Sequence, residues 1–565
     1  MNNNSLVLGS PRFETHVQAA AGDDAGRWAA LLFGLNSSAA AQAASRVQGD
    51  FAVAMSLADG SVFMAVDRFA AQTLCYRIEH QQRPARLRFA AQASELADDL
   101  TGSQPDLDPQ ALFDYLYFHV IPSPRTIHRN VRRLQPGHCA VFRDGQLHTA
   151  AYWQATFSTS SKPNFGELKD EFRQLLSTAV KRQLDGTPVA CFLSGGTDSS
   201  TVTGMLAQAG GPPPAAYSIG FEAEGYDEMA YARLAAKHFG AVHHALYVTP
   251  DDLVRNIPFV AGAGDQPFGN SSALPAYCCA LQARNDGVTR ILAGDGGDEL
   301  FGGNSRYATQ EIFGWYQHVP AALRKGLMEP FFGLGPVGRT PLLKKGTGYI
   351  RQANTALPER LQAFNLVRRL GYANVLSPGF LNQVDSAGVS ALQQAVWDAA
   401  QSQHEIDRHL AYDWRYTLAE SDLPKVRSTT AMAGLSVGFP MLDDDLLAFS
   451  MRLPPQYKLS RLRLRWFFKE ALRGFLPAEI LSKKKQGFGL PFGVWAMRHE
   501  GLKQLATDSL RSVATRGVVR PEFVKQLLEV RLPEHPHYYG TMVWILMMLE
   551  QWLRQHAPNY RCQSA

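Results

Sequence analysis

The feature that most constrains the fold is an alternation of short apolar runs with helical segments in the middle of the chain. The runs are VACFL (189–193), AAYSIGF (215–221), HHALYV (243–248) and RILAG (290–294). Each is short enough for a buried strand, and each is followed by residues with helical spacing of apolar positions. Strands that alternate with helices predict an α/β fold built on a doubly wound parallel sheet.

The N-terminal part has a different pattern. Two pairs of apolar segments are joined at Asp59-Gly60 and at Asp144-Gly145, and such dipeptides are typical of tight hairpin turns. We therefore predict a β-rich α+β domain over residues 1–157, a polar linker, and a second domain over 165–565 that is mostly helical beyond residue 305.

Composition narrows the class of protein. The 565 residues are 45% hydrophobic and carry 56 Lys and Arg against 51 Asp and Glu, a formal net charge of +5. We interpret this excess as spread over a long surface, which argues against nucleic acid or membrane as a partner. No apolar run reaches the length of a spanning helix, the start resembles no secretory signal, and the six cysteines form no CxxC pair. These features predict a cytoplasmic protein.

The junction CFLSGGTDSS, residues 191–200, connects the first apolar run to a helix. Its two glycines let backbone N–H groups converge on an anion at the start of that helix. Asp198 would repel a phosphate unless a cation lay between them, so we predict that it is a Mg²⁺ ligand. The lysine of a Walker loop is absent. A glycine turn capped by Ser and Asp remains the alternative reading.

Two further stretches favour a nucleotide site. LAGDGGDELFGG (292–303) again ends a strand with glycines and carries three acids, and LSKKKQGFGLPFG (481–493) supplies a lysine cluster. Loops at the carboxyl ends of parallel strands share one crevice. An anion loop, an acidic loop and distant lysines together predict a Mg-nucleotide site, although a lysine run on its own is usually a solvated face.

Taken in this order, SGGTDSS, SIGFEAEGYDE (218–228), GDGGDELFGG and KQGFG resemble the synthetase domain of the asparagine synthetase family, within the ATP-pyrophosphatase superfamily. The resemblance covers about residues 165–500. It implies an adenine-nucleotide α-hydrolase-like domain with ATP and Mg²⁺ as cofactors. It also implies a reaction in which a carboxylate attacks the ATP α-phosphate, pyrophosphate leaves, and an amine captures the acyl-adenylate as an amide.

The resemblance assigns roles to individual residues. Asp198 and Asp298 would hold Mg²⁺, Asp295 would accept the proton of the amine, and Lys485 would neutralise charge at the α-phosphate. The residues that would bind ATP and pyrophosphate are Leu193, Ser194, Gly195, Gly196, Asp198, Ser199, Ser200, Ser218, Gly220 and Gly294. We assign His243 and His244 to a strand and not to a metal site.

The N-terminal domain departs from the family. The family's glutaminase uses a cysteine directly after the initiator Met, where this chain has Asn2, and the motifs that grip glutamine are absent. The first cysteine, Cys75, lies in a predicted buried strand, where a thiol stays protonated. We therefore expect a degenerate amidotransferase-like domain without glutamine hydrolysis.

A second departure lies in KVRSTTAMAGLSVGFPMLD (425–443), where the family usually has more charged residues. Arg427, Ser428, Ser436 and Gly438 replace an acid, an Arg, a Glu and a second Arg. We interpret the replacements as the loss of a clamp for aspartate, with a purely structural pairing of those charges as the alternative.

Several functions remain open at this stage. The prediction is an ATP-dependent amide ligase that joins a small-molecule or peptide carboxylate to an amine or ammonia. A lasso-peptide-type macrocyclase, a tailoring enzyme, an asparagine synthetase and a catalytically dead binding protein are the alternatives. The sequence names neither the carboxylate nor the amine, and it leaves a homodimer open.

Overall fold

The structure is a computed structural model. It describes residues 5–14, 17, 22–34, 37–57, 59–80, 85–97, 105–158, 164–223, 225–333, 341–484 and 489–562, with only the backbone of 37, 38, 333 and 341–344.

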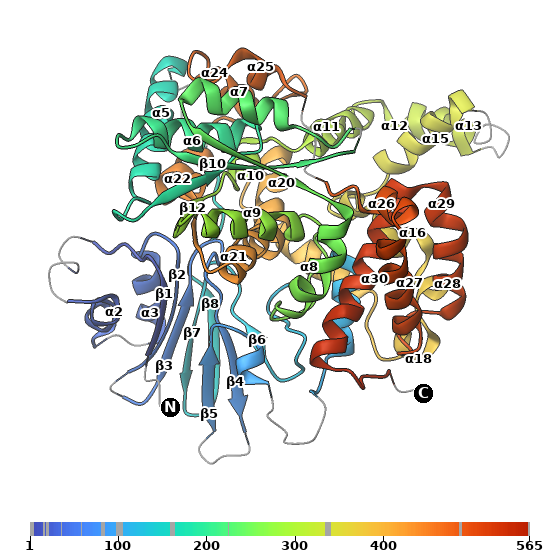
Figure 1. The fold of residues 1–565 in the computed structure, drawn as a ribbon, viewed down its shortest axis with the longest axis horizontal. Coiled ribbons are helices and arrows are strands. Elements are labelled where there is room, and N and C mark those ends of the chain that lie inside the picture. Colours follow the sequence, from blue (N-terminus) through green and yellow to red (C-terminus); the bar gives the residue numbers. More distant parts are fainter. Residues whose placement is uncertain are drawn as a thin grey trace.

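The N-terminal part contains two antiparallel sheets, drawn in blue in Figure 1. One has the strand order β1-β2-β3-β7-β8 and the other β5-β4-β6. Both predicted hairpins are present, because β2 pairs with β3 and β7 pairs with β8. Asp144 and Gly145 have φ of 52° and 79°, as a tight two-residue turn requires. The strands are Ser5–Gly9 (β1), Phe51–Ser56 (β2), Val62–Val66 (β3), Cys75–Glu79 (β4), Arg86–Ala90 (β5), Arg132–Arg133 (β6), His138–Arg143 (β7) and Gln146–Ala151 (β8).

The predicted parallel sheet is confirmed. Its order is β11-β10-β9-β12-β13, and every neighbouring pair is parallel. The chain winds outward in one direction from β9 to β11 and then continues on the other side with β12, so the switch point lies between β9 and β12. The strands are Val189–Phe192 (β9), Ala215–Phe221 (β10), Val242–Val248 (β11), Arg290–Leu292 (β12) and Ser436–Gly438 (β13).

Both faces of this sheet are covered, which explains why its strands are almost continuously apolar. Ala190 and Tyr217 pack into one hydrophobic cluster, and their neighbours Cys191 and Ala216 pack into another. Helices α5, α6 and α7 cover one face, and α8, α9 and α21 cover the other (Figure 1). These helices are Phe165–Lys181 (α5), Thr197–Gln208 (α6), Met229–Phe239 (α7), Pro250–Gly262 (α8), Ala273–Asn285 (α9) and Leu423–Met432 (α21).

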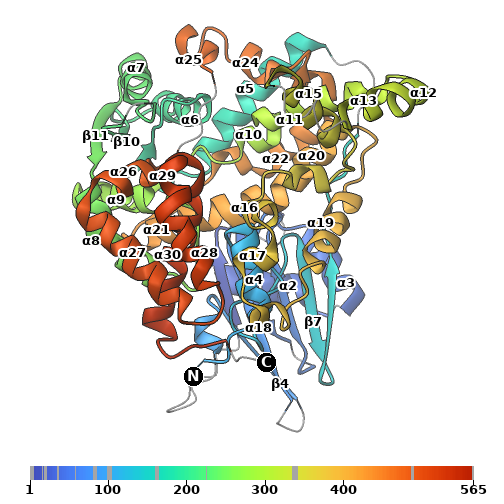
Figure 2. The ribbon, with the colours of Figure 1, turned by 90° about the vertical axis from the view of Figure 1, so that its right-hand side faces the viewer.

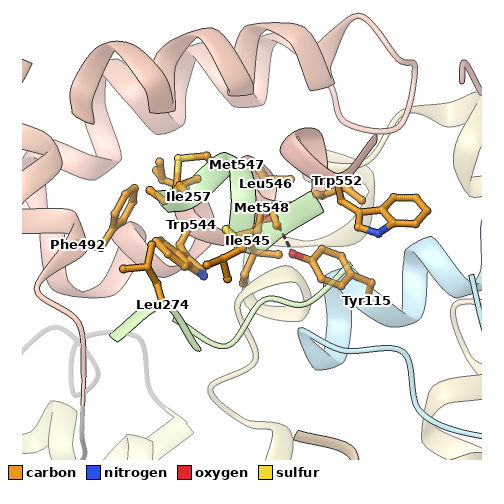
Figure 3. Close-up of a cluster of buried hydrophobic side chains, with 14 of the residues drawn as sticks. Tyr115, Ile257, Leu274, Phe492, Trp544, Ile545, Leu546, Met547, Met548 and Trp552 are labelled. Carbon is orange, nitrogen blue, oxygen red and sulfur yellow. Dashed lines mark hydrogen bonds between the residues drawn. The ribbon is translucent and has the colours of Figure 1, made fainter. Parts of the chain in front are cut away.

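One hydrophobic cluster crosses the predicted domain boundary. It joins α4 (Pro109–Phe118) of the N-terminal part to C-terminal helices, among them α26 (Phe492–Arg498), α27 (Glu500–Ala514) and α30 (Pro536–His556). The Tyr115 hydroxyl donates a 2.8 Å hydrogen bond to the carbonyl oxygen of Ile545 inside this cluster, as Figure 3 shows. Helix α4 therefore packs as part of the C-terminal core.

Beyond residue 305 the described chain is mainly helical, as predicted. One group of helices extends away from the rest of the molecule in both ribbon views (Figures 1 and 2). It comprises α11 (Ser305–Gln317), α12 (Ala321–Leu323), a π-helical turn (Arg324–Met328), α13 (Glu329–Gly333) and α15 (Pro341–Ala353). Among the described residues, none of the helices combines the length and the apolar character needed to cross a bilayer.

Candidate active site

The loops that follow β9 and β12 meet at the switch point of the parallel sheet. A Cβ atom on Gly294 would lie 2.7 Å from the backbone nitrogen of Ser199, so the two loops approach too closely for any side chain at that position. Both loops line a cavity of about 1300 Å³. Ligands bind at this place in open α/β sheets.

The loop after β9 is folded tightly by its small residues. Gly195 has a φ of 72°, and a Cβ there would lie 2.4 Å from the backbone nitrogen of Ala232, so only glycine fits. The Ser199 hydroxyl accepts a 3.1 Å hydrogen bond from the Ser194 backbone N–H. This fold points the N-terminus of the twelve-residue helix α6 at the cavity, and the positive end of the helix dipole attracts an anion there.

An arginine from a distant part of the chain lies between the two predicted metal ligands. Arg465 Nη1 donates to Asp198 Oδ2 at 2.9 Å and to Asp298 Oδ1 at 2.7 Å, and Nη2 pairs with the second oxygen of Asp198. The Arg465 side chain is 5% exposed. The two carboxylates therefore converge on one cationic group, at the point where the acidic loop meets the start of α6.

The backbone holds this arginine in place. Arg465 has a φ of 54°, and Arg461 and Leu462 also have positive φ, a conformation that non-glycine residues rarely adopt. The Arg465 N–H donates to the Lys458 carbonyl at 2.9 Å, and its guanidinium lies 3.9 Å from the centre of the Phe468 ring. Sequence reasoning missed Arg465, since no local pattern marks one arginine of RLRLRW as the buried one.

The Asp198 and Asp298 carboxylates fit a Mg²⁺ ion. Their oxygens already converge on one cation, and Mg²⁺ typically takes one or two carboxylates together with phosphate oxygens and water. The described part of the chain contains no group of three or more His, Cys, Asp or Glu side chains arranged to hold a metal without such help. A nucleotide phosphate would supply the missing ligands.

Cations form much of the remaining wall. The described lining carries seven acids against seven Lys or Arg, so the cavity has no net positive charge, and the cations gather on the side formed by residues 463–484. Lys483 is paired with Glu228 at 2.6 Å, so the lysine cluster is only partly available to a ligand. The lining cations at this side are Arg463, Arg465, Lys469, Arg473, Lys483 and Lys484.

Asp295 lies on the acidic loop next to Lys425, a residue for which the sequence analysis predicted no role. Lys425 Nζ lies 3.8 Å from Asp295 Oδ1 and 3.0 Å from Asp422 Oδ1. Burial raises the pKa of Asp295 above its usual range, with the Lys425 ammonium opposing the shift and the Asp422 carboxylate adding to it. A carboxylate with a raised pKa that borders a cavity is suited to accept a proton.

Comparison with known proteins identifies the family. The model of the asparagine synthase family matches residues 171–554, and that of a glutamine amidotransferase domain matches residues 31–153. The chain belongs to the asparagine synthase family. Its members include ATP-dependent ligases, and the chain is accordingly an enzyme of the ligase type.

Curated relatives of the family align with most of the chain. A putative glutamine-hydrolysing asparagine synthetase of Mycobacterium tuberculosis (strain H37Rv) is 28% identical and covers 80% of this chain and 68% of its own length. The glutamine-hydrolysing asparagine synthetase 1 of Bacillus subtilis is 24% identical, covering 90% and 78%. An amidase of Penicillium rubens is 23% identical, covering 85% and 77%.

Most of the family-like site residues lie around the cavity. The predicted residues that line it are Leu193, Ser194, Gly196, Asp198, Ser199, Gly294, Asp295 and Asp298. Lys485 lies outside the described residues, so its role stays a prediction.

Four predicted residues do not reach the cavity wall. Ser218 is buried, and its hydroxyl donates to the Leu193 carbonyl, while Tyr217 and Ile219 of the same strand line the cavity. Gly195 and Gly220 are covered by neighbouring groups, and Ser200 Oγ is buried without a hydrogen-bond partner in the structure. These residues shape the loop and the strand beneath the site.

The two strand histidines are explained without a metal. His243 Nε2 lies 2.8 Å from the Ser218 hydroxyl, and His244 Nδ1 lies 3.2 Å from Asp286 Oδ2. Each therefore has a partner within the sheet and its adjoining helix, as expected for strand residues.

The expected loss of an aspartate clamp is not supported by the geometry. Arg427 points to the N-terminal sheets and donates to the Thr73 hydroxyl at 2.9 Å. Ser436 and Gly438 lie on the edge strand β13, and neither they nor Ser428 lines the cavity. Because these positions lie outside the site, their altered charges do not identify the substrate, and the structural alternative is the better account.

None of the six cysteines of the chain is an activated thiol. Burial raises the pKa of Cys75 to about 12 and that of Cys139 to about 11. It also raises the pKa of the others, which are Cys191, Cys278, Cys279 and Cys562. A nucleophilic cysteine needs the opposite shift.

Proposed function

We propose that this ligase forms an amide bond by adenylating a carboxylate with ATP and that it does so without hydrolysing glutamine. The observation that carries the proposal is the meeting of three groups at the ends of β9 and β12. Backbone N–H groups at the start of α6, a pair of carboxylates that share one cation, and the acid Asp295 all border one cavity.

The first half-reaction uses the β9 side of the cavity. A carboxylate oxygen of the substrate bonds to the α-phosphorus of ATP, and the bond from that phosphorus to the bridging oxygen of pyrophosphate breaks. The loop of residues 194–196 and the α6 N-terminus bind the leaving pyrophosphate. Asp198 and Asp298 would hold Mg²⁺, which neutralises phosphate charge when bound, and Arg465 keeps their carboxylates aligned.

The second half-reaction uses the β12 side. The amine nitrogen bonds to the acyl carbon, AMP leaves, and the amine gives up a proton. Asp295 is the acceptor with the best placement, because it borders the cavity and burial raises its pKa toward the range of a useful base. Lys425 forms an ion pair with the Asp295 carboxylate and so helps to fix the position of that carboxylate at the cavity.

The absence of glutamine hydrolysis is supported by the cysteines. Every thiol in the chain has a raised pKa, so none provides the thiolate that an amidotransferase of this kind requires. Ammonia or another amine would then reach the acyl-adenylate directly.

The test is an ATP–pyrophosphate exchange assay on the full chain with a panel of amino acids, other small carboxylates and peptides. We expect Mg²⁺-dependent exchange with one class of carboxylate and formation of AMP together with an amide when the amine is added. Production of ADP and phosphate, or release of glutamate from glutamine, would contradict the proposal.

A further inference from the structure

The projecting helices α11–α15 expose large apolar side chains at helical spacing. Leu323, Leu327 and Phe331 are 45%, 62% and 45% exposed and are four residues apart. The adjacent stripe, Met328 and Phe332, packs on a small core formed with α11 and α15. The outer helix is thus apolar on the side it buries and also along a neighbouring stripe that faces solvent.

The same projection is basic. Its described side chains over residues 321–332 and 345–353 include four Lys or Arg and one acid, Glu329, which gives them a net charge of +3. The basic residues are Arg324, Lys325, Lys345 and Arg351.

We propose that the projection, through its described side chains over residues 321–332 and 345–353, docks the enzyme on the surface of an anionic lipid bilayer. Apolar side chains on an outer helix can enter the boundary between headgroups and acyl chains, while clustered Lys and Arg are attracted to anionic headgroups. Trp315, on the preceding helix and 50% exposed, is a residue type that favours this boundary.

The shape of the surface favours a bilayer over an acidic protein. The exposed stripe lies on helices that extend outward from the molecule in both views (Figures 1 and 2), which suits a broad flat partner. None of the described residues 321–332 and 345–353 lines the cavity at the ends of β9 and β12, so the two proposals can be tested independently.

The test is flotation of the full chain with vesicles of phosphatidylcholine alone and with vesicles that contain an equal amount of phosphatidylglycerol. Each Lys or Arg that lies near an anionic surface raises the affinity for that surface by a further factor. We therefore expect at least about tenfold more binding to the anionic vesicles than to the neutral ones. Binding should decrease as salt is raised, since salt screens exposed charges. Equal binding to both vesicles, or none to either, overturns the proposal.

Matched variants locate the surface. The double change Leu327→Ser and Phe331→Ser, and separately Lys325→Glu, should each reduce vesicle binding several-fold. Phe33→Ser removes an 86% exposed side chain from the N-terminal part, and Lys503→Glu reverses an exposed charge on α27; both should bind like the unchanged protein. An unchanged thermal midpoint confirms that each variant is folded. Variants of the projection that bind normally, or binding instead to soluble polyglutamate with no affinity for vesicles, would refute bilayer docking.

Discussion

Replacing Arg465 by Met should destabilise the protein in a way that Mg²⁺ reverses. The substitution keeps much of the side-chain volume but leaves the Asp198 and Asp298 carboxylates, 18% and 20% exposed, without the cation between them. Breaking a fully buried ion pair costs about 3–5 kcal/mol. Because both carboxylates border the cavity and keep some contact with water, we expect a smaller cost of about 2–3 kcal/mol here, below that range.

Thermal unfolding followed by circular dichroism, with and without Mg²⁺ alone, measures this effect. The midpoint of the Arg465→Met variant should fall by several degrees, and Mg²⁺ should raise it more than it raises the midpoint of the unchanged protein, because the ion replaces the lost cation. Arg516→Met is the matched control. It breaks a more deeply buried pair with Glu550, away from the cavity, and should lose stability without gaining any response to Mg²⁺. An identical Mg²⁺ response in all three proteins would refute the assignment of a metal to the Asp198 and Asp298 pair.

Three further predictions concern the chemistry and the core. Asp295→Asn should retain pyrophosphate exchange but lose amide formation. In the unchanged enzyme the amide-forming step should fail as the pH drops through the raised pKa of Asp295, hence at a higher pH than the value near 4 of an ordinary aspartate, which a pH profile of each half-reaction measures. Cys75→Ala should change neither amide formation nor the rate of glutamate release from glutamine, which should stay at background in an enzyme-coupled glutamate assay, because the thiol has a pKa of about 12. Tyr115→Phe should cost about 0.5–1.5 kcal/mol in denaturant unfolding. The Ile545 carbonyl loses one hydrogen-bond donor but keeps its place in the backbone ladder of helix α30, and no measurable change would contradict a stabilising role for the hydroxyl.

The sequence was sufficient for the parts of the fold that follow from local pattern. The runs at 189–193 and 290–294 became strands because both their faces are buried, and Asp144-Gly145 became a turn because its two residues adopt positive φ. The acidic loop and the β9 loop meet because strands that are parallel end at the same edge. Each of these inferences needed only a few neighbouring residues and one rule of sheet geometry.

The parts that could not be predicted depend on contacts between distant segments. Arg465 contacts Asp198, which lies 267 positions away in the chain. Its buried location depends on positive φ angles at Arg461, Leu462 and Arg465, and these residue types do not predict such a conformation. Arg427 was misread for the same reason. Because it stands where the family usually has an acid, its position suggested the loss of a clamp for aspartate, whereas its side chain donates a hydrogen bond to Thr73 of the other domain.

Helix α4 gives the ligase a structural reason to keep its N-terminal domain that is independent of the chemistry of that domain. In sequence α4 belongs to that domain, but its side chains complete the hydrophobic core around α30. Deletion of the domain would therefore expose the apolar side chains of α30 to water. Substitutions can erase an active site one residue at a time at little cost in stability, whereas removal of the whole segment would leave a protein that no longer folds. Selection for the folded ligase is therefore enough to preserve the domain, and its presence today is no argument that it ever acts on glutamine.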